Sequence, residues 1–293
     1  MNERTHICIV GGDSAIGRAL RDHLIAQGLS PLVSSRRRTA EQNGFFLDME
    51  HSSVEALFRD CDVVVLVAAI TRLADCRTHP GLARRVNVEA PIELAKRAFD
   101  HGATVIFLST NQVFDGSLPS VAPENPLSPR SVYGKLKAEA ENGLRALGGS
   151  LAVVRLGKVV GPNLALFETW ETELAAGRTV RAFDDLKMAP IAIGKVAHGL
   201  ERIASRRATG TFHLGCLEEI SYADAARHLA LRLGADPACV LKALAAESGI
   251  PDEERPAHVS LAPGQTVALT GFECNVARAE LDVGLGFEPW APA

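Results

Sequence analysis

Three side chains in the middle of the chain have types and spacings that suit redox chemistry at a carbonyl group. Tyr133 and Lys137 are four residues apart, so in a helix the phenol and the ammonium lie on one face. Thr110 adds a hydroxyl upstream of them. Reduction of a ketone develops negative charge on its oxygen, and a phenol placed against that oxygen can donate a hydrogen bond and then a proton. The three residues therefore predict hydride transfer to or from a carbonyl, with Tyr133 as the proton donor.

A free tyrosine is too weak an acid for this role. Lowering its pKa from about 10 to about 7 takes roughly 4 kcal/mol. A lysine charge about 4 Å away, at an effective dielectric constant of about 20, is worth about 4 kcal/mol. We therefore expect Lys137, together with an oxidised nicotinamide, to lower the pKa of Tyr133, and we expect Thr110 to be the second donor to the substrate oxygen. The alternative is a half-buried Tyr133 beside a solvated Lys137, because a Tyr-x-x-x-Lys spacing alone occurs in many helices.

The elements on either side of these residues place them at one edge of a sheet. Residues 105–108 form an apolar run typical of a buried parallel strand, so Ser109 and Thr110 fall at its carboxyl end, where open α/β sheets bind ligands. Ser131 can cap the helix that carries Tyr133. Between strand and helix, residues 115–130 contain four prolines. We expect a stiff loop that arches over the site.

A second motif, near the N-terminus, is typical of dinucleotide binding. A short apolar strand leads into a glycine turn and then into a helix. Glycine lets the backbone approach a pyrophosphate, and the helix N-terminus supplies free N–H groups. Gly11 and Gly17 hold the outer positions of a G-x-x-G-x-x-G spacing, while Ser14 replaces the middle glycine and can offer its hydroxyl to a phosphate; Ala15 and Ile16 complete the turn. The alternative is an ordinary tight turn between strand and helix.

The end of the next strand predicts which dinucleotide binds. Residues 32–34 form this strand, and Ser35, Arg36, Arg37 and Arg38 follow it. A site for NAD usually carries an acid here for the ribose 2′-hydroxyl, and no acid follows this strand in the sequence. Guanidinium groups suit a 2′-phosphate, so we favour NADP over NAD as the cofactor. The alternative is that the arginines belong to a solvated loop.

Three further residues have side chains that suit a bound dinucleotide. Asp48 follows a third short strand, where its carboxylate can accept a hydrogen bond from an adenine amino group. Ala68 and Ala69 follow a fourth strand, and small side chains there let a cofactor lie close over the backbone. Ser109, Tyr133 and Lys137 complete the predicted cofactor-binding residues. Asn87, in a long helical region, either orders the site or has a structural role, and we favour the structural role.

Composition excludes several classes of function. The chain has 293 residues, 47% of them apolar, and a formal charge of -4, which does not suit nucleic-acid binding. The longest apolar run, residues 63–70, is too short to span a bilayer, and the first residues lead directly into a strand without a signal peptide. We therefore expect a cytoplasmic protein. We also expect reduced thiols and no metal site, because metal-ligand spacing is lacking both among the six cysteines and among His198, His213, His228 and His258.

Six segments, taken in order, resemble the extended short-chain dehydrogenase/reductases: GGDSAIG, AAIT, VNVEAPIELAKRA, FLSTNQVFDG, YGKLKAEAE and VVRLGKVVGP. Within this family the chain is most similar to the dTDP-4-dehydrorhamnose reductase branch, whose STD-x-VFDG segment is close to STNQVFDG here. The resemblance implies NAD(P)-dependent redox chemistry, often on a nucleotide-linked sugar. It places the family's catalytic hydroxyl, tyrosine and lysine on Thr110, Tyr133 and Lys137. Asn111 and Gln112 replace the Asp and the aromatic residue of that branch, which puts the substrate in doubt.

We predict an α/β fold with two parts. Residues 1–165 form a Rossmann-type doubly wound parallel sheet that binds NAD(P), and residues 166–293 form a smaller C-terminal substrate lobe that returns in part to the main sheet. The basic residues of the second half are candidates for a substrate phosphate, and none is assigned individually; they include Lys158, Arg178, Arg181 and Lys187.

Three functions agree with these patterns. The first is a reductase in which NADPH delivers hydride to a ketone on a sugar or a similar polar substrate, and we favour it. The second is an NAD-dependent epimerase or dehydratase, for which the sequence supplies no clear additional acid or base. The third is a non-catalytic NADP-binding regulatory subunit. The expected partner is a small molecule such as a nucleotide sugar, and we expect no binding to nucleic acid or to a membrane. A homodimer is an open alternative to a monomer.

Overall fold

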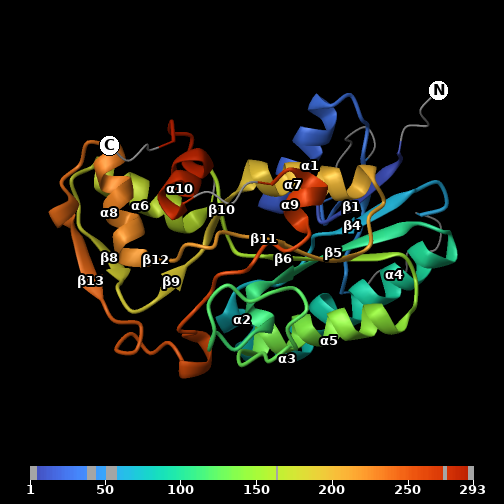
Figure 1. The fold of residues 1–293 in the computed structure, drawn as a ribbon, viewed down its shortest axis with the longest axis horizontal. Helices are drawn as coiled ribbons and strands as arrows, with labels where there is room; N and C mark the ends of the chain where they lie inside the picture. Colours follow the sequence, from blue (N-terminus) through green and yellow to red (C-terminus); the bar gives the residue numbers. More distant parts are fainter. Residues whose placement is uncertain (1–4, 38–43, 51–57, 163, 273–275, 290–293) are drawn as a thin grey trace.

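A parallel sheet forms the centre of the molecule (Figure 1). The computed structural model describes residues 5–37, 44–50, 58–162, 164–272 and 276–289. Within these residues, parallel strands follow the order β11-β6-β5-β4-β1-β2-β3, which changes direction between β4 and β1. This arrangement confirms the predicted doubly wound Rossmann-type sheet. The strands are β1 (Ile7–Val10), β2 (Leu32–Ser35), β3 (Gly44–Phe46), β4 (Val63–Leu66), β5 (Thr104–Thr110), β6 (Leu151–Leu156) and β11 (Gly210–Leu214).

Helices cover both faces of this sheet (Figure 1). The central strands β1, β4 and β5 are buried along their whole length, which explains why their sequences are continuous apolar runs rather than alternating ones. One face carries α1 (Ala15–Ala26), α7 (Ile193–Ser205) and α9 (Thr266–Thr270). The other face carries α2 (Leu73–Thr78), α3 (Pro80–Arg84), the π-helical turn η1 (Arg85–Glu89), α4 (Ala90–Asp100) and α5 (Val132–Ala146).

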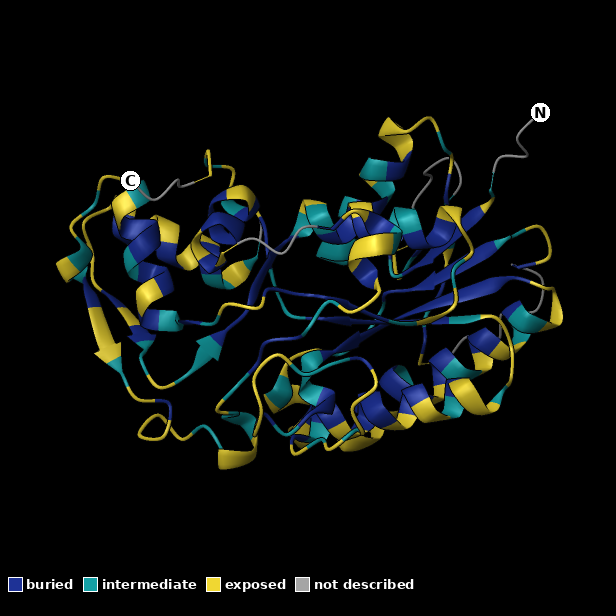
Figure 2. Ribbon diagram, viewed as in Figure 1, coloured by how far each residue is buried: buried dark blue, intermediate teal, exposed yellow. Residues whose placement is uncertain are grey.

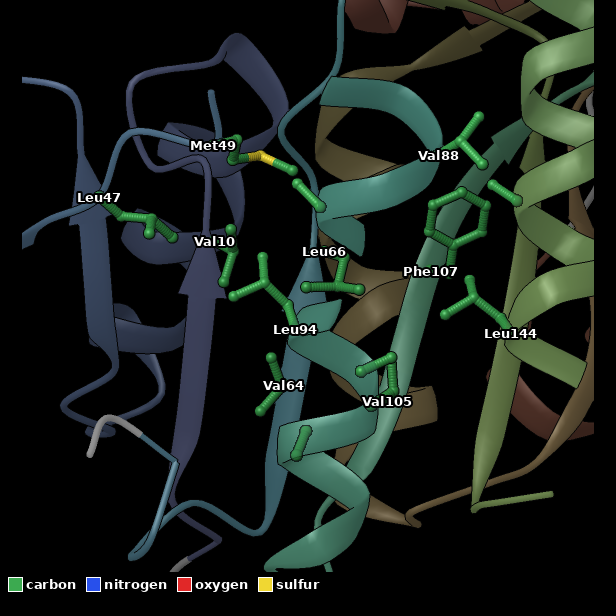
Figure 3. Close-up of a cluster of buried hydrophobic side chains, with 14 of the residues drawn as sticks. Val10, Leu47, Met49, Val64, Leu66, Val88, Leu94, Val105, Phe107 and Leu144 are labelled. Carbon is green, nitrogen blue, oxygen red and sulfur yellow. The ribbon is translucent and has the colours of Figure 1, made fainter. Parts of the chain in front are cut away.

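The hydrophobic core is divided by the sheet into two layers (Figure 2). In the layer under α4 and α5, Leu94 and Leu144 pack against the side chains of three adjacent strands, including Val64 and Phe107 (Figure 3). The opposite layer lies under α1 and α7 and contains Leu24. These two layers fix the strands in register, so that their carboxyl ends meet along one edge where the polar residues of the site are placed.

The second half of the chain forms a smaller lobe with its own core and also returns to the main sheet. The core of this lobe includes Trp170 and Leu229. Its helices are α6 (Ala165–Ala175), α8 (Tyr222–Arg232) and α10 (Ala277–Leu285). Its strands pair as β7 (Lys158–Val160) with β10 (Pro190–Ala192), β8 (Val180–Phe183) with β13 (Val240–Ala243), and β9 (Lys187–Met188) with β12 (Ile220–Ser221). The returning pieces are β11, which pairs with β6, and α7, which packs on α1.

Two sequence-based expectations about local structure differ from the molecule. The long helical region that contains Asn87 is continuous only from Pro80 to Asp100, because the chain turns at His79 and separates α2 from it; the Pro80 ring pre-organises the new helix start. The proline-rich loop follows a short 3-10 helix, η2 (Asn111–Val113), and none of the loop's residues lines the cavity that contains Tyr133. Its backbone instead bonds to a distant segment, because Gly116 accepts from His258 and Val121 pairs with Ser260 and Ala262. The short helices η3 (Pro237–Cys239) and η4 (Asp252–Glu254) complete the described elements.

Candidate active site

The glycine turn between β1 and α1 is shaped by close backbone approaches. Gly11 has a φ of +104°, and a Cβ there would lie 2.6 Å from the backbone nitrogen of Ala68. A Cβ on Gly17 would lie 2.2 Å from the carbonyl oxygen of Gly11. Ser14 caps α1, because its hydroxyl accepts from the Gly17 N–H at 3.0 Å and donates to the Gly11 carbonyl at 2.8 Å. The structure therefore uses the Ser14 hydroxyl within the turn, whereas we expected it to be offered to a phosphate.

Beside this turn lies a cavity of about 270 Å³, which we call the nucleoside cavity because predicted cofactor-binding residues line it. It brings together six of the residues predicted to bind the cofactor. Ala15, Ile16 and Gly17 lie in the adjoining turn and first helical residues, whereas the exposed Arg37 does not line the cavity. Arg38 lies outside the described residues. The six lining residues are Gly11, Ser14, Arg36, Asp48, Ala68 and Ala69.

An acid occupies the end of β2, which corrects the expectation that none is present. It is Asp13 of the glycine turn, whose carboxylate accepts from the Ser35 hydroxyl at 2.9 Å and from the Arg36 N–H at 2.9 Å. Asp13 and Arg36 both line the nucleoside cavity. The residues that follow β2 in the sequence do not indicate this acid, because the turn before α1 supplies it from 22 residues upstream.

The loop after β4 is fixed by Asn87. The Asn87 side chain is fully buried, accepts from the Ile70 N–H at 2.8 Å and donates to the Ile70 carbonyl at 2.9 Å. Since Ile70 lines the nucleoside cavity, Asn87 has a structural role that also orders the wall of the site. One oxygen of the Asp48 carboxylate already accepts a hydrogen bond from the Glu50 N–H, at 3.0 Å.

A second cavity, of about 390 Å³, contains the three predicted catalytic residues. Thr110 at the end of β5 and Tyr133 and Lys137 on α5 all line it, as do Ile16 and Ser109. Ala69 lines both cavities, so the two adjoin there, and we refer to them together as the cleft. Ser131 caps α5 by accepting from the Gly134 N–H at 3.0 Å, as predicted. The cleft therefore runs from the glycine turn to the phenol of Tyr133.

Burial governs the acidity of Tyr133 and Lys137. It raises the pKa of Tyr133 well above its ordinary value, and the hydrogen bond with the Thr110 side chain opposes this rise only in part. It lowers the pKa of Lys137 to about 7, although the negative charge of Glu141 acts in the opposite direction. The Lys137 ammonium lies 3.8 Å from the centroid of the Phe107 ring. The protein groups alone thus do not lower the pKa of Tyr133 toward 7, because water is excluded from both residues.

A buried polar network holds the base of the site. Glu141 on α5 accepts from Ser109 at 2.6 Å, from Arg155 on β6 at 3.0 and 2.8 Å, and from Arg145 at 3.0 Å. Burial alone would raise the pKa of Glu141, but the hydrogen bonds and the charge of Arg155 hold it below its usual value. The Ser109 hydroxyl therefore donates its proton to Glu141, and toward a cofactor its oxygen can act only as an acceptor.

The smaller lobe supplies the opposite wall of the second cavity. Lys158, Lys187 and Tyr222 line it, with the Lys158 ammonium 5.7 Å from the Tyr222 ring centroid. Val259 lines it too, and its carbonyl accepts from the Asn111 side chain at 2.9 Å. The other two basic candidates do not line the cavity: Arg178 forms an ion pair with Glu173, and Arg181 is exposed on β8.

Tyr222 and Val259 were not found from the sequence. They lie 89 and 126 residues beyond Tyr133 in the numbering, with no motif to connect them. Glu219 positions their surroundings, because it accepts from the backbone of Val259 at 2.7 Å and of Ser260 at 3.0 Å, and it also bonds to Lys187 at 3.3 Å.

No helix in the described part of the chain is long and apolar enough to cross a membrane.

Relatives of this chain include sugar-related reductases. The profile described as the RmlD substrate binding domain matches residues 5–284. A probable low-salt glycan biosynthesis reductase from Haloferax volcanii is 30% identical over 205 residues, covering 68% of this chain and 67% of that protein. The dTDP-4-dehydrorhamnose reductase of Mycobacterium tuberculosis is 28% identical over 229 residues, covering 75% and 74%.

Other relatives have a different kind of name, and solved structures share the fold. Methionine adenosyltransferase 2 subunit beta from Bos taurus is 29% identical over 157 residues, and the alignment covers 53% of this chain and about half, 47%, of that protein. A dTDP-4-dehydrorhamnose reductase from Bacillus anthracis in complex with NADP superimposes with a TM-score of 0.80 at 17% identity, covering 94% of this chain and 96% of that one. The profile match and the reductase relatives confirm the resemblance, and the chain belongs to the RmlD substrate binding domain family of extended short-chain dehydrogenase/reductases.

Proposed function

We propose that this protein is an NAD(P)-dependent reductase that acts on a ketone of a nucleotide-linked sugar. The observation that carries the proposal is the cavity lined by Thr110, Tyr133 and Lys137, which shares Ala69 with the adjoining nucleoside cavity. The fit of a dinucleotide is supported by the tight turn at Gly11 and Gly17, which only glycine allows, because a Cβ at either position would clash with the backbone of Ala68 or of Gly11. The relatives' names give the same reaction class.

In this mechanism the bound nicotinamide supplies the hydride. The Tyr133 hydroxyl donates its proton to the substrate oxygen as that oxygen gains negative charge, and the Thr110 hydroxyl donates a hydrogen bond to the same atom. Lys137 in its charged form stabilises the resulting phenolate of Tyr133. Because the pKa of Lys137 is about 7, its charge responds to any further negative group that enters the cavity. Burial of all three residues excludes water and strengthens each of these electrostatic interactions.

For the cofactor, we favour NADP over NAD because Arg36 lies at the rim of the nucleoside cavity. Asp13 acts against this preference, since its carboxylate lies beside the Arg36 backbone and would repel a 2′-phosphate. The balance between the two charges sets the ratio of affinities. We expect both dinucleotides to bind, with NADPH the tighter.

For the substrate, we propose that Lys158 and Lys187 attract a diphosphate and that Tyr222 contacts the nucleoside. These residues line the wall of the second cavity opposite the catalytic residues. No carboxylate or imidazole lines this cavity among the residues that the structure describes. A dehydratase or epimerase usually needs a further acid or base, so the lining favours simple reduction.

The test of this function is the Tyr133→Phe variant assayed with NADPH and a panel of keto sugars linked to dTDP or UDP, beginning with dTDP-4-dehydrorhamnose. Loss of the general acid should lower kcat by about 100-fold or more, while the dissociation constant for NADPH stays within twofold. Full turnover by the variant would exclude this mechanism.

A regulatory subunit is a second candidate, because several relatives are named as a subunit of methionine adenosyltransferase. The catalytic residues are intact here, which argues for an enzyme. If wild-type protein binds NADPH tightly and oxidises it with none of the keto sugars, the regulatory function becomes the better description.

A further inference from the structure

Two histidines and a glutamate meet where α7 packs on α1, on the face of the sheet opposite α5 (Figure 1). His23 lies in the last turn of α1, and His198 and Glu201 are three residues apart on α7. One ring nitrogen from each histidine and one carboxylate oxygen of Glu201 all lie within 4.8 Å of one another. The two imidazole rings are edge to face, with centroids 5.8 Å apart.

The His23 ring carries an orphaned polar atom. Its Nε2 is buried and has no hydrogen-bond partner among the residues that the structure describes. A buried nitrogen of this kind is costly unless something bonds to it. The side chains of His198 and Glu201 form no hydrogen bond or ion pair with any residue that the structure describes, so their ligand atoms are available to a metal.

The donor set matches one class of ligand. Two imidazoles and one carboxylate are a common set for Zn²⁺, with water in the fourth position, whereas Mg²⁺ and Ca²⁺ prefer oxygen donors alone. Tetrahedral bonds of about 2.0 to 2.1 Å separate the ligand atoms by roughly 3.4 Å. His198 is exposed and Glu201 is half-buried, so rotation of these two side chains can shorten the present separations, while the partly buried His23 stays in place.

We propose that His23, His198 and Glu201 form a binding site for zinc or a similar transition-metal dication that joins α7 to α1. The site is structural rather than catalytic. His23 is eight residues beyond Ala15, which places it about 12 Å along the helix axis from the turn of the dinucleotide site. The metal would connect α7, which comes from the second half of the chain, to the helix that follows the glycine turn.

The experiment uses the untagged full chain, treated with chelator and then titrated with ZnCl₂. Calorimetry should show one strong site per chain, and saturating zinc should raise the midpoint of thermal unfolding by about 5 to 10 °C, whereas MgCl₂ should not. Co²⁺ should give the intense visible absorption of a tetrahedral site. His198→Ala and Glu201→Gln should each weaken zinc binding by at least roughly tenfold.

His101→Ala is the matched control, because His101 is an exposed histidine at the end of α4, distant in sequence from both helices. This variant should leave the zinc affinity unchanged. Zinc bound instead by the partly exposed thiols of Cys61 and Cys239 would be insensitive to His198→Ala. Circular dichroism of the metal-free variants checks that they fold. The proposal is overturned if wild-type protein binds no zinc at micromolar concentration, or if His198→Ala and Glu201→Gln bind it as tightly as wild type does.

Discussion

Replacing Glu141 with Gln should destabilise the protein far more than any exposed charge does. Glu141 and Arg155 are 0% and 2% exposed, and they form two hydrogen bonds of 2.8 and 3.0 Å. Glutamine keeps the shape of the side chain but leaves the guanidinium of Arg155 as an unpaired buried charge. Breaking a buried pair in this way costs about 3 to 5 kcal/mol. At roughly 2 to 4 °C per kcal/mol for chains approaching this size, the unfolding midpoint should fall by about 10 °C.

The assay is thermal unfolding at neutral pH, with chemical denaturation to give the free energy. Glu139→Gln is the control, because Glu139 lies on the same helix and pairs with Arg84 at 2.5 Å but is 45% exposed. Exposed pairs contribute less than about 1 kcal/mol. If both variants change the midpoint by the same small amount, the reasoning about the buried network is wrong.

The same substitution should also affect the site. The charge of Glu141 raises the pKa of Lys137 against the effect of burial. Its removal should lower that pKa further, so the high-pH loss of reductase activity should begin at lower pH. An unchanged pH profile in Glu141→Gln would show that the charge of Glu141 does not change the pKa of Lys137.

Three further predictions concern the cofactor, the substrate and acid stability. Arg36→Ala should weaken NADPH binding by about tenfold and NADH binding by less than twofold, as measured by fluorescence titration; equal losses would remove Arg36 from 2′-phosphate recognition. Lys158→Met should raise KM for the nucleotide sugar with little change in kcat, and a fall in kcat alone would contradict a binding role. Burial and the charge of Arg155 lower the pKa of His213 to about 4, below about 6.5 in the unfolded chain, so the folded state resists its protonation. His213 should therefore lower the free energy of unfolding by up to about 3 kcal/mol as pH falls from about 6.5 to 4, as measured by chemical denaturation at each pH. If the free energy of unfolding of His213→Gln falls equally steeply, this prediction is wrong.

The parts of the fold that follow from local chemistry could be predicted from the sequence. The apolar runs of β4 and β5, the cap at Ser131 and the spacing of Tyr133 and Lys137 each report on neighbouring residues only. Their meeting at one edge follows from the general rule for parallel sheets. Thr110, Tyr133 and Lys137 could therefore be brought to one cavity without coordinates.

The features that were missed depend on pairs far apart in the chain. Asp13 reaches the end of β2 from the turn before α1, and the backbone of the proline-rich loop bonds to residues 258–262. The acidity of Tyr133 depends on how completely water is excluded, which spacing does not report. Sequence spacing also could not bring together His23 and His198, which are 175 residues apart in the numbering.

Hydride transfer to a ketone beside Tyr133 can be followed with a labelled hydride. NADPH deuterated at C4, prepared as both diastereomers, is incubated with wild-type protein and a dTDP-linked 4-keto sugar, and the product is analysed by mass spectrometry. We predict that one diastereomer gives an alcohol product one mass unit heavier, with one equivalent of NADP⁺ formed per product. Product that carries no deuterium from either diastereomer, or that forms without consumption of NADPH, would contradict the account.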